Sequence, residues 1–167
     1  RYMAMYVLSE DGTALGRNAT ALHLGDRLNV IVIVENHMAR EGRIELDTLI
    51  AGNASSSSPA PWDGGSRLQG QVLNLDDGGR TAMPMTFAVT RASAEGDSIA
   101  VEEIELNGVK IPVTVESGTG NRALRFIFRA LVWSDAEGRY VPEWNDGQED
   151  HASWLQIWFE LLPGVGT

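Results

Sequence analysis

The chain has 167 residues, of which 43% are hydrophobic and 22% are charged, a composition typical of a soluble globular protein with one sizeable core. It carries 13 Lys+Arg against 23 Asp+Glu, a formal net charge of -10, and no cysteine. The charge disfavours nucleic acid and anionic lipid surfaces as partners. The lack of cysteine excludes disulfides, thiolate nucleophiles and cysteine-based zinc sites. We expect a single domain over residues 1–167.

Short strand-like segments separated by turns fill the N-terminal part. Tyr2 to Leu8 leads into an Asp11-Gly12 turn, Arg27 to Glu35 is rich in Val and Ile, and Arg43 to Ala51 follows. Because the segment from Arg27 to Glu35 is apolar on both faces, we expect it inside a sheet that is covered on both sides.

Residues 52–66, GNASSSSPAPWDGGS, are rich in Ser, Pro and Gly and predict a long surface loop. After this loop, Leu68 to Leu75 and Thr81 to Val89 flank the turn sequence DDGG. This arrangement predicts a β-hairpin.

A second hairpin is predicted around Asn107-Gly108, because Asn-Gly between two alternating apolar segments is a strong hairpin signal. Its arms are Ile99 to Leu106 and Val109 to Glu116. Pro112 cannot donate a ladder hydrogen bond, so the second arm is expected at a sheet edge. In the first arm the apolar phase slips at Glu102-Glu103, which indicates a β-bulge.

Two further strands, Arg122 to Ser134 and Ser153 to Leu162, close the chain, and an acidic, turn-rich connection joins them. No long segment shows the apolar period of 3.6 residues that a helix needs. Strands spaced by turns predict an all-β fold, an antiparallel Ig-like β-sandwich.

The residues that carry catalytic or metal chemistry are sparse. His23, His37 and His151 lie far apart in sequence and are interpreted as surface histidines. Neither G-x-S-x-G nor a P-loop occurs. Asn145, Asp146 and Asp150 offer oxygen donors that calcium accepts, but their segment lacks the EF-hand spacing and is better explained as a solvated acidic loop. We therefore expect no enzyme activity, no metal and no cofactor.

Two sequons, Asn18-Ala19-Thr20 and Asn53-Ala54-Ser55, make Asn18 and Asn53 candidate N-glycosylation sites. The chain also begins at Arg1 without an initiator Met, so we expect an upstream signal peptide or membrane anchor. Both features favour an extracytoplasmic setting.

The closing segment WLQIWFELLP has an unusual distribution of tryptophans. With a period of two, one face carries the apolar residues of an ordinary core stripe, namely Leu155, Ile157, Phe159 and Leu161. The opposite face, which should meet water, carries Trp154, Gln156, Trp158 and Glu160. In the preceding strand, Arg125, Ile127, Arg129, Leu131 and Trp133 share a face in the same way.

If the two closing strands pair antiparallel, these two outer stripes lie side by side, and Arg125 and Arg129 are placed to stack on indole rings. We define a candidate interaction face by Trp133, Trp154, Trp158, Arg125 and Arg129. Three interpretations are open. The face is covered by the protein itself, as a second core layer; it docks another protein; or it is a platform on which sugar rings stack.

Two parts of the chain resemble a known family. The opening YVLSEDGTALGRNATALHLGDRLNVIVIVENHMAREGRIEL has Asn…Thr…Leu-x-x-Gly before a Val/Ile run that ends in Glu35-Asn36-His37, and the close has ALRFIFRALVW and then WLQIWFEL. These segments resemble the uncharacterised domain-of-unknown-function family 1616 of archaeal and bacterial membrane proteins. The resemblance covers residues 1–50 and 123–167, and the middle departs from it.

The resemblance implies an Ig-like domain borne outside the membrane, and no catalytic residue transfers with it. We therefore expect an extracytoplasmic structural or protein-interaction module of a cell-envelope or membrane-anchored protein. Its partners would be other envelope or membrane proteins or further copies of itself. The alternative is a carbohydrate-binding β-sandwich domain with a Trp platform.

Overall fold

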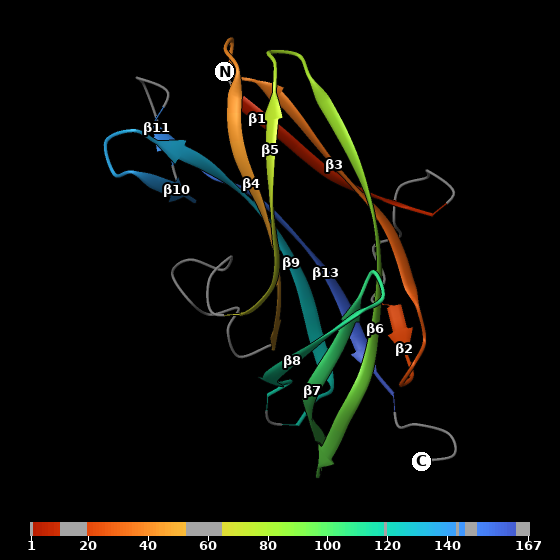
Figure 1. Cartoon of the computed structure of the whole chain (residues 1–167). Helices are drawn as coiled ribbons and strands as arrows, with labels where there is room; N and C mark the ends of the chain where they lie inside the picture. The colour runs from red at the N-terminus through yellow and green to blue at the C-terminus, as the bar shows by residue number, and fades with distance from the viewer. Residues whose placement is uncertain are drawn as a thin grey trace.

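The computed structural model describes residues 2–10, 20–52, 65–118, 120–142, 144–145 and 150–162. These residues form strands and turns and contain no helix (Figure 1). The strands, in chain order, are β1 (Tyr2–Ser9), β2 (Thr20–Leu22), β3 (Leu28–His37), β4 (Gly42–Gly52), β5 (Ser66–Leu75), β6 (Arg80–Glu95), β7 (Ser98–Leu106), β8 (Val109–Glu116), β9 (Ala123–Ser134), β10 (Arg139–Val141), β11 (Trp144–Asn145), β12 (Asp150–His151) and β13 (Ser153–Leu161).

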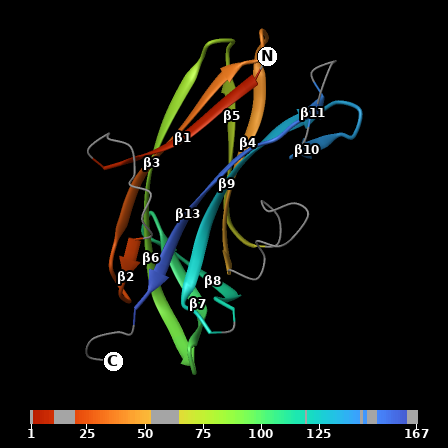
Figure 2. The ribbon, with the colours of Figure 1, turned by 180° about the vertical axis from the view of Figure 1, so that it is seen from behind.

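Two sheets make up a sandwich. The five-stranded sheet has the order β1-β3-β6-β7-β8, and the six-stranded sheet has the order β2-β13-β9-β4-β5, with β10 pairing to β9. Figure 2 shows β9 and β13 side by side in the six-stranded sheet. Neighbouring strands pair antiparallel except β2, which pairs parallel to β13. The predicted all-β, antiparallel β-sandwich is confirmed.

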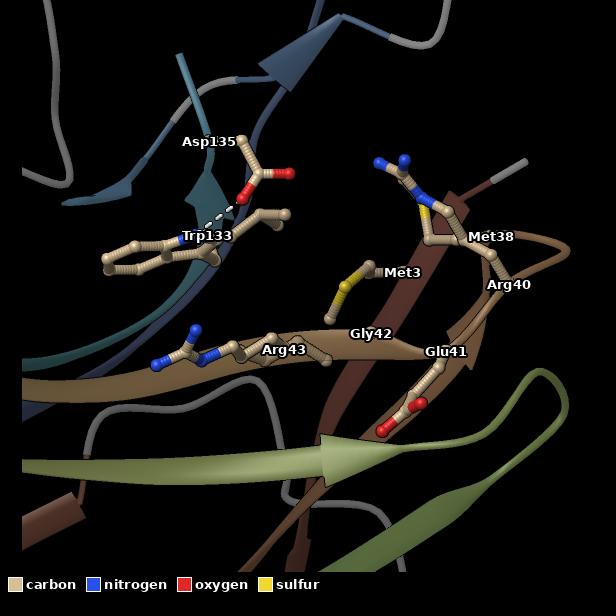
Figure 3. A pocket seen from close by; sticks show the side chains of 10 residues that line it. Met3, Met38, Arg40, Glu41, Gly42, Arg43, Trp133 and Asp135 are labelled. Carbon is tan, nitrogen blue, oxygen red and sulfur yellow. Dashed lines mark hydrogen bonds between the residues drawn. The ribbon is translucent and has the colours of Figure 1, made fainter. Parts of the chain in front are cut away.

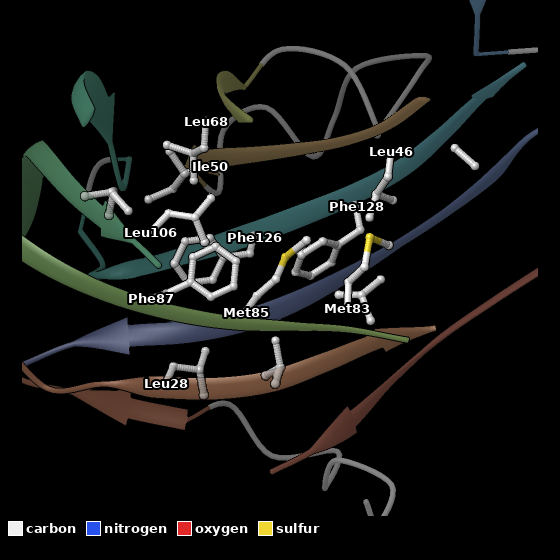
Figure 4. Packing of buried hydrophobic residues seen from close by; sticks show 14 of the residues in the cluster. Leu28, Leu46, Ile50, Leu68, Met83, Met85, Phe87, Leu106, Phe126 and Phe128 are labelled. Carbon is white, nitrogen blue, oxygen red and sulfur yellow. The ribbon is translucent and has the colours of Figure 1, made fainter. Parts of the chain in front are cut away.

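The core lies between the two sheets, and its centre is aromatic (Figure 4). Phe87 from the five-stranded sheet stacks on Phe126 from the six-stranded sheet, with ring centres 4.2 Å apart. Phe126 in turn stacks on Phe159 at 4.8 Å. The Phe87–Phe126 contact buries apolar surface from both layers at once and holds the sheets face to face, whereas the Phe126–Phe159 contact joins neighbouring strands of one sheet.

The predicted core stripe of the closing strand is confirmed for its second half. Phe159 and Leu161 are fully buried in the cluster that contains Val30 and Val32, whereas Leu155 and Ile157 pack against this cluster and are half-buried.

The predicted hairpin around DDGG is wrong. β5 belongs to the six-stranded sheet and β6 to the five-stranded sheet, so the turn carries the chain across the sandwich. The turn is bonded to the end of β3: the Gly78 amide donates to the Asn36 carbonyl at 2.6 Å, and the Asn36 amide donates to Gly79 at 2.9 Å. A turn sequence specifies that the chain reverses, but distant contacts decide which strands its arms join.

The predictions for the hairpin around Asn107-Gly108 are confirmed, whereas the Asp11-Gly12 turn and residues 53–64 of the predicted loop lie outside the described residues. Asn107 and Gly108 have φ angles of 50° and 82°, and Leu106 pairs with Val109, as a two-residue hairpin with a type I′ turn requires. β8, which carries Pro112, forms the edge of its sheet, and the β7–β8 register shifts between Val101 and Glu103 as the predicted bulge demands.

Candidate interaction site

The outer face of the six-stranded sheet contains the predicted interaction residues. Along β9 and β4, alternate residues enter the core, and the residues between them face away from it. The antiparallel pairing of β9 with β13 is confirmed, and it sets Trp158 opposite Arg125 and Trp154 opposite Arg129. Of the five predicted residues, these four therefore form one cluster.

Arg125 is the centre of one half of this cluster. It is fully buried, its Nη1 donates to Gln156 Oε1 at 2.7 Å, and its guanidinium carbon lies 5.6 Å from the centre of the Trp158 ring. The predicted stacking of Arg125 on an indole is thus confirmed. Burial lowers the pKa of the Arg125 guanidinium from its ordinary value, and the cation is stabilised by the ring face and the amide oxygen.

Arg129 belongs to an ionic network that the sequence did not reveal. Its Nε and Nη2 donate to Asp47 Oδ2 at 3.2 and 3.1 Å. Arg67 on β5 donates through Nε to Asp47 Oδ1 at 3.1 Å and through Nη2 to Glu45 at 2.6 Å. Burial and the neighbouring Asp47 raise the pKa of the Glu45 carboxyl, and Arg67 and Arg129 oppose that rise. The network therefore joins β5, β4 and β9.

A small apolar cluster lies on the same face. Leu49, Ala51 and Ile127 are buried, and the half-buried Trp154 packs against them. Arg125 and Asp47 are buried as well, so the middle of this outer face is not exposed to solvent. The first of the three interpretations, a second core layer, accounts for this part.

Trp133 lies apart from the other two tryptophans, in an aromatic corner that we define by Trp133, Tyr140 and Arg43. β10 brings Tyr140 opposite Trp133, and the two rings meet edge to face at 5.2 Å. The Arg43 guanidinium carbon lies 4.4 Å from the Trp133 ring centre. The indole Nε1 donates to Asp135 Oδ1 at 3.0 Å, which sets the direction of the ring.

A pocket of about 160 Å³ opens beside this corner (Figure 3). Apolar side chains from both sheets line it, and Arg40 and Trp133 stand on opposite sides with Met3 between them. Glu41 points away toward β5. The lining residues are Met3, Met38, Arg40, Glu41, Gly42, Arg43, Ile44, Val132, Trp133 and Asp135. Among the predicted interaction residues, Trp133 is placed in the lining of this pocket.

The remaining predicted sites are the glycosylation and calcium candidates. Asn18, Asn53 and Asp146 lie outside the described residues. Asn145 and Asp150 are register partners in the short β11–β12 pair. Within the described ranges, no three His, Asp or Glu side chains come together in a way that would hold a metal ion. Nor does any helix in those ranges have the length and apolar character needed to cross a membrane.

The fold and this site define a β-sandwich module with an aromatic, cation-bearing corner beside a small pocket of mixed polar and apolar lining. No protein-family model matches the chain, and no curated protein matches its sequence. Weak structural similarity links it to the CARDB domain of a Pyrococcus furiosus protein in complex with di-metal ions, with 7% identity, a TM-score of 0.48, and coverage of 96% of this chain and 88% of that one.

Two further solved structures are similar over only part of their length. The Pseudomonas fluorescens alkylpurine DNA glycosylase bound to DNA has 12% identity and a TM-score of 0.44, over 95% of this chain and 30% of that one. The Listeria innocua β-glucosidase in complex with gluconolactone has 12% identity and a TM-score of 0.40, over 98% and 17%. At these identities and scores none of the three transfers a function to this chain.

Proposed function

We propose that this protein is a non-catalytic interaction module, and that it docks a partner protein at the aromatic corner and the adjoining pocket. The observation that carries the proposal is the position of Trp133. Its ring is half-buried, it is held by Asp135 and Arg43, and it borders a pocket that both apolar and charged side chains line. Trp and Arg are the residues most often found as anchors of protein interfaces.

The pocket suits one apolar side chain of a partner. A volume of about 160 Å³ is close to the size of an engineered protein cavity that admits one benzene ring. Met3 and Met38 contribute flexible thioethers, which adapt to side chains of different shape. Arg40 and Asp135 at the rim supply a donor and an acceptor that can meet the polar main chain on either side of such an anchor.

The setting we propose is extracytoplasmic, in a cell-envelope or membrane-anchored protein whose partners are other envelope proteins. The two sequons at Asn18 and Asn53 and the resemblance of the opening and closing segments support this setting. Mass spectrometry of the protein purified from its own source provides the test. A glycan at either asparagine supports the setting, and two unmodified asparagines remove that support.

Photo-crosslinking in the source cells tests the docking site. A photoreactive phenylalanine analogue replaces Trp133 in one variant and Val109, a valine exposed at a different sheet edge, in a second. We expect a discrete protein adduct from position 133 and none from position 109. Equal labelling at both positions, or no adduct at position 133, contradicts the proposal.

A carbohydrate platform, the alternative function, predicts a different result. Trp154 and Trp158 are four residues apart on β13, about 13 Å at strand rise, which is a spacing that a row of sugar rings can use. Under that alternative, Trp158→Ala abolishes retention on immobilised glycans while circular dichroism still shows a folded domain, and position 133 gives no protein adduct. One set of variants therefore separates the two functions.

A further inference from the structure

Among the described strands, β5 forms an edge of the six-stranded sheet, and this edge carries no charge over most of its length. In the described part of the chain β5 pairs with β4 alone. Its sequence from Leu68 to Leu75, LQGQVLNL, has no charged residue and no proline, and Val72 is 53% exposed. Soluble proteins commonly protect such edges with charges, proline or a covering segment, because the unpaired backbone groups accept another strand.

The other described edges of the two sheets have such protection. β8 carries Lys110, Pro112 and Glu116, and β2 is only three residues long. β1 is uncharged, but β13 begins beside it, and the Ser153 hydroxyl donates to the Met3 carbonyl at 3.1 Å. β5 thus combines length, neutrality and exposure.

The surface beside this edge is also electrically neutral, although the chain as a whole has a formal charge of -10. Glu45 pairs in register with Val72, and its charge is met by Arg67. The Arg67 guanidinium passes over Gly70 to reach Glu45 and Asp47. A Cβ at position 70 would collide with this guanidinium, so the contact requires glycine there. The repulsion that two acidic copies feel elsewhere is therefore weak here.

We propose that a second copy of this chain pairs antiparallel with β5, about a two-fold axis at Val72. This pairing joins the two six-stranded sheets into one continuous sheet. An antiparallel pair of identical strands is self-complementary, as a two-fold interface requires. With the axis at Val72, that valine faces its mate, and Gly70 faces Asn74 of the other copy, so no like charges oppose each other and no bulky pair clashes. The proposal is independent of the docking function of the Trp133 corner.

Sedimentation velocity over a range of concentrations tests the pairing with two matched variants. Val72→Lys sets two cations opposite each other at the axis, and Val109→Lys changes a valine of similar exposure, 62%, on another strand. We expect the wild-type chain and Val109→Lys to sediment as dimers at high concentration and Val72→Lys to remain monomeric. Circular dichroism checks that both variants are folded. A wild-type chain that is monomeric throughout overturns the proposal, as does a dimer that survives Val72→Lys.

A single introduced cysteine tests the position of the axis, because the chain has no cysteine of its own. Directly opposite residues in an antiparallel pair have Cα atoms about 4.5 to 5.5 Å apart, within the range that a disulfide spans. Under mild oxidation we expect Val72→Cys to form a covalent dimer and Val109→Cys to stay monomeric. Failure of Val72→Cys to cross-link, or equal cross-linking of both variants, rejects this register.

Discussion

Arg125 on β9 lies directly opposite Trp158 on β13, with its guanidinium carbon 5.6 Å from the centre of the indole ring. Arg125 is fully buried, whereas Trp158 is half-buried and forms the outer member of the pair. The tryptophan on the nominally solvent-facing side of the closing strand therefore shields a buried cation. This arrangement gives Trp158 a structural role whether or not a partner also contacts it.

Replacing Trp158 with Ala should destabilise the domain itself. The change removes a large half-buried side chain and one of the groups that stabilise the Arg125 cation. We expect a loss of about 2–4 kcal/mol in the free energy of unfolding, at or below the range for fully buried aromatic residues. Urea denaturation measures it. Glu160→Ala, an exposed position on the same strand, is the control and should change stability little. Equal stability of the wild type and Trp158→Ala would show that Arg125 does not depend on the ring.

The ionic network around Asp47 gives a second prediction, in which the buried carboxylate contributes more to stability than its exposed partner Arg67. Asp47 is 2% exposed, and it binds Arg129, whose side chain is 18% exposed, and Arg67, whose side chain is 54% exposed. Asp47→Ala leaves Arg129 without this carboxylate in a mostly buried position, and we expect a loss of about 3–5 kcal/mol. Arg67→Ala removes an exposed partner and should cost no more than about 1 kcal/mol. Thermal denaturation of both variants checks the difference, and similar losses would contradict it.

The strands, and the residues that share each sheet face, were predictable because both follow from the alternation of apolar and polar residues along the sequence. Phe159 and Arg125 occupy the faces that a period of two assigns to them, and the Asn107-Gly108 turn determines its own hairpin. The same rules place Trp158 beside Arg125 once β9 and β13 pair. What alternation specifies is which residues share a face.

Partners that are distant in the chain were not predictable in this way. Asp47, Arg67 and Asn36 carry no local signal of their roles, because each acts through contacts with other strands. The DDGG turn gave a wrong hairpin for the same reason, since β5 pairs with β4 and β6 pairs with β3, and neither pairing is visible in the turn sequence. β2 has only three residues, too few to show a period, and its parallel pairing with β13 depends on the closing strand.

Stability should depend on pH through Glu35. Hydrogen bonds from His37 at 3.1 Å and from the Tyr6 hydroxyl at 2.9 Å lower the pKa of the Glu35 carboxyl. A lowered folded-state pKa contributes stability above the ordinary carboxyl range, and that stability is lost as the pH falls through the folded value. The melting temperature of the wild type should therefore exceed that of Glu35→Gln at pH 7, and the gap should close as the pH falls below the ordinary carboxyl range. Tyr6→Phe should show a smaller gap of the same shape. A gap that stays constant with pH would reject this assignment.

The buried side chain of Asn36 binds both segments that cross between the sheets at this end, the one between β3 and β4 and the one between β5 and β6. Its Nδ2 donates to the carbonyls of Leu75 and Arg40, each at 2.8 Å, and its Oδ1 accepts from the Met38 amide at 3.0 Å. Asn36→Ala leaves these main-chain groups without the side chain that binds them. Each buried unsatisfied group costs about 1–3 kcal/mol, so we expect a total loss of about 3 kcal/mol or more.

Asn36→Asp makes the prediction specific to the two donated bonds. A carboxylate keeps the acceptor for Met38 but cannot donate to Leu75 and Arg40, and its oxygen would face their carbonyls. We expect it to be at least as destabilising as Asn36→Ala near neutral pH, although it preserves the size of the side chain. Asn74→Ala, an exposed asparagine near the end of β5, is the matched control and should be close to neutral. Hydrogen exchange of the Met38 amide provides a local measurement, since its protection should fall sharply in Asn36→Ala and less in Asn36→Asp. Near-normal stability of Asn36→Asp would mean that the two donated bonds are dispensable and that packing alone holds the crossing.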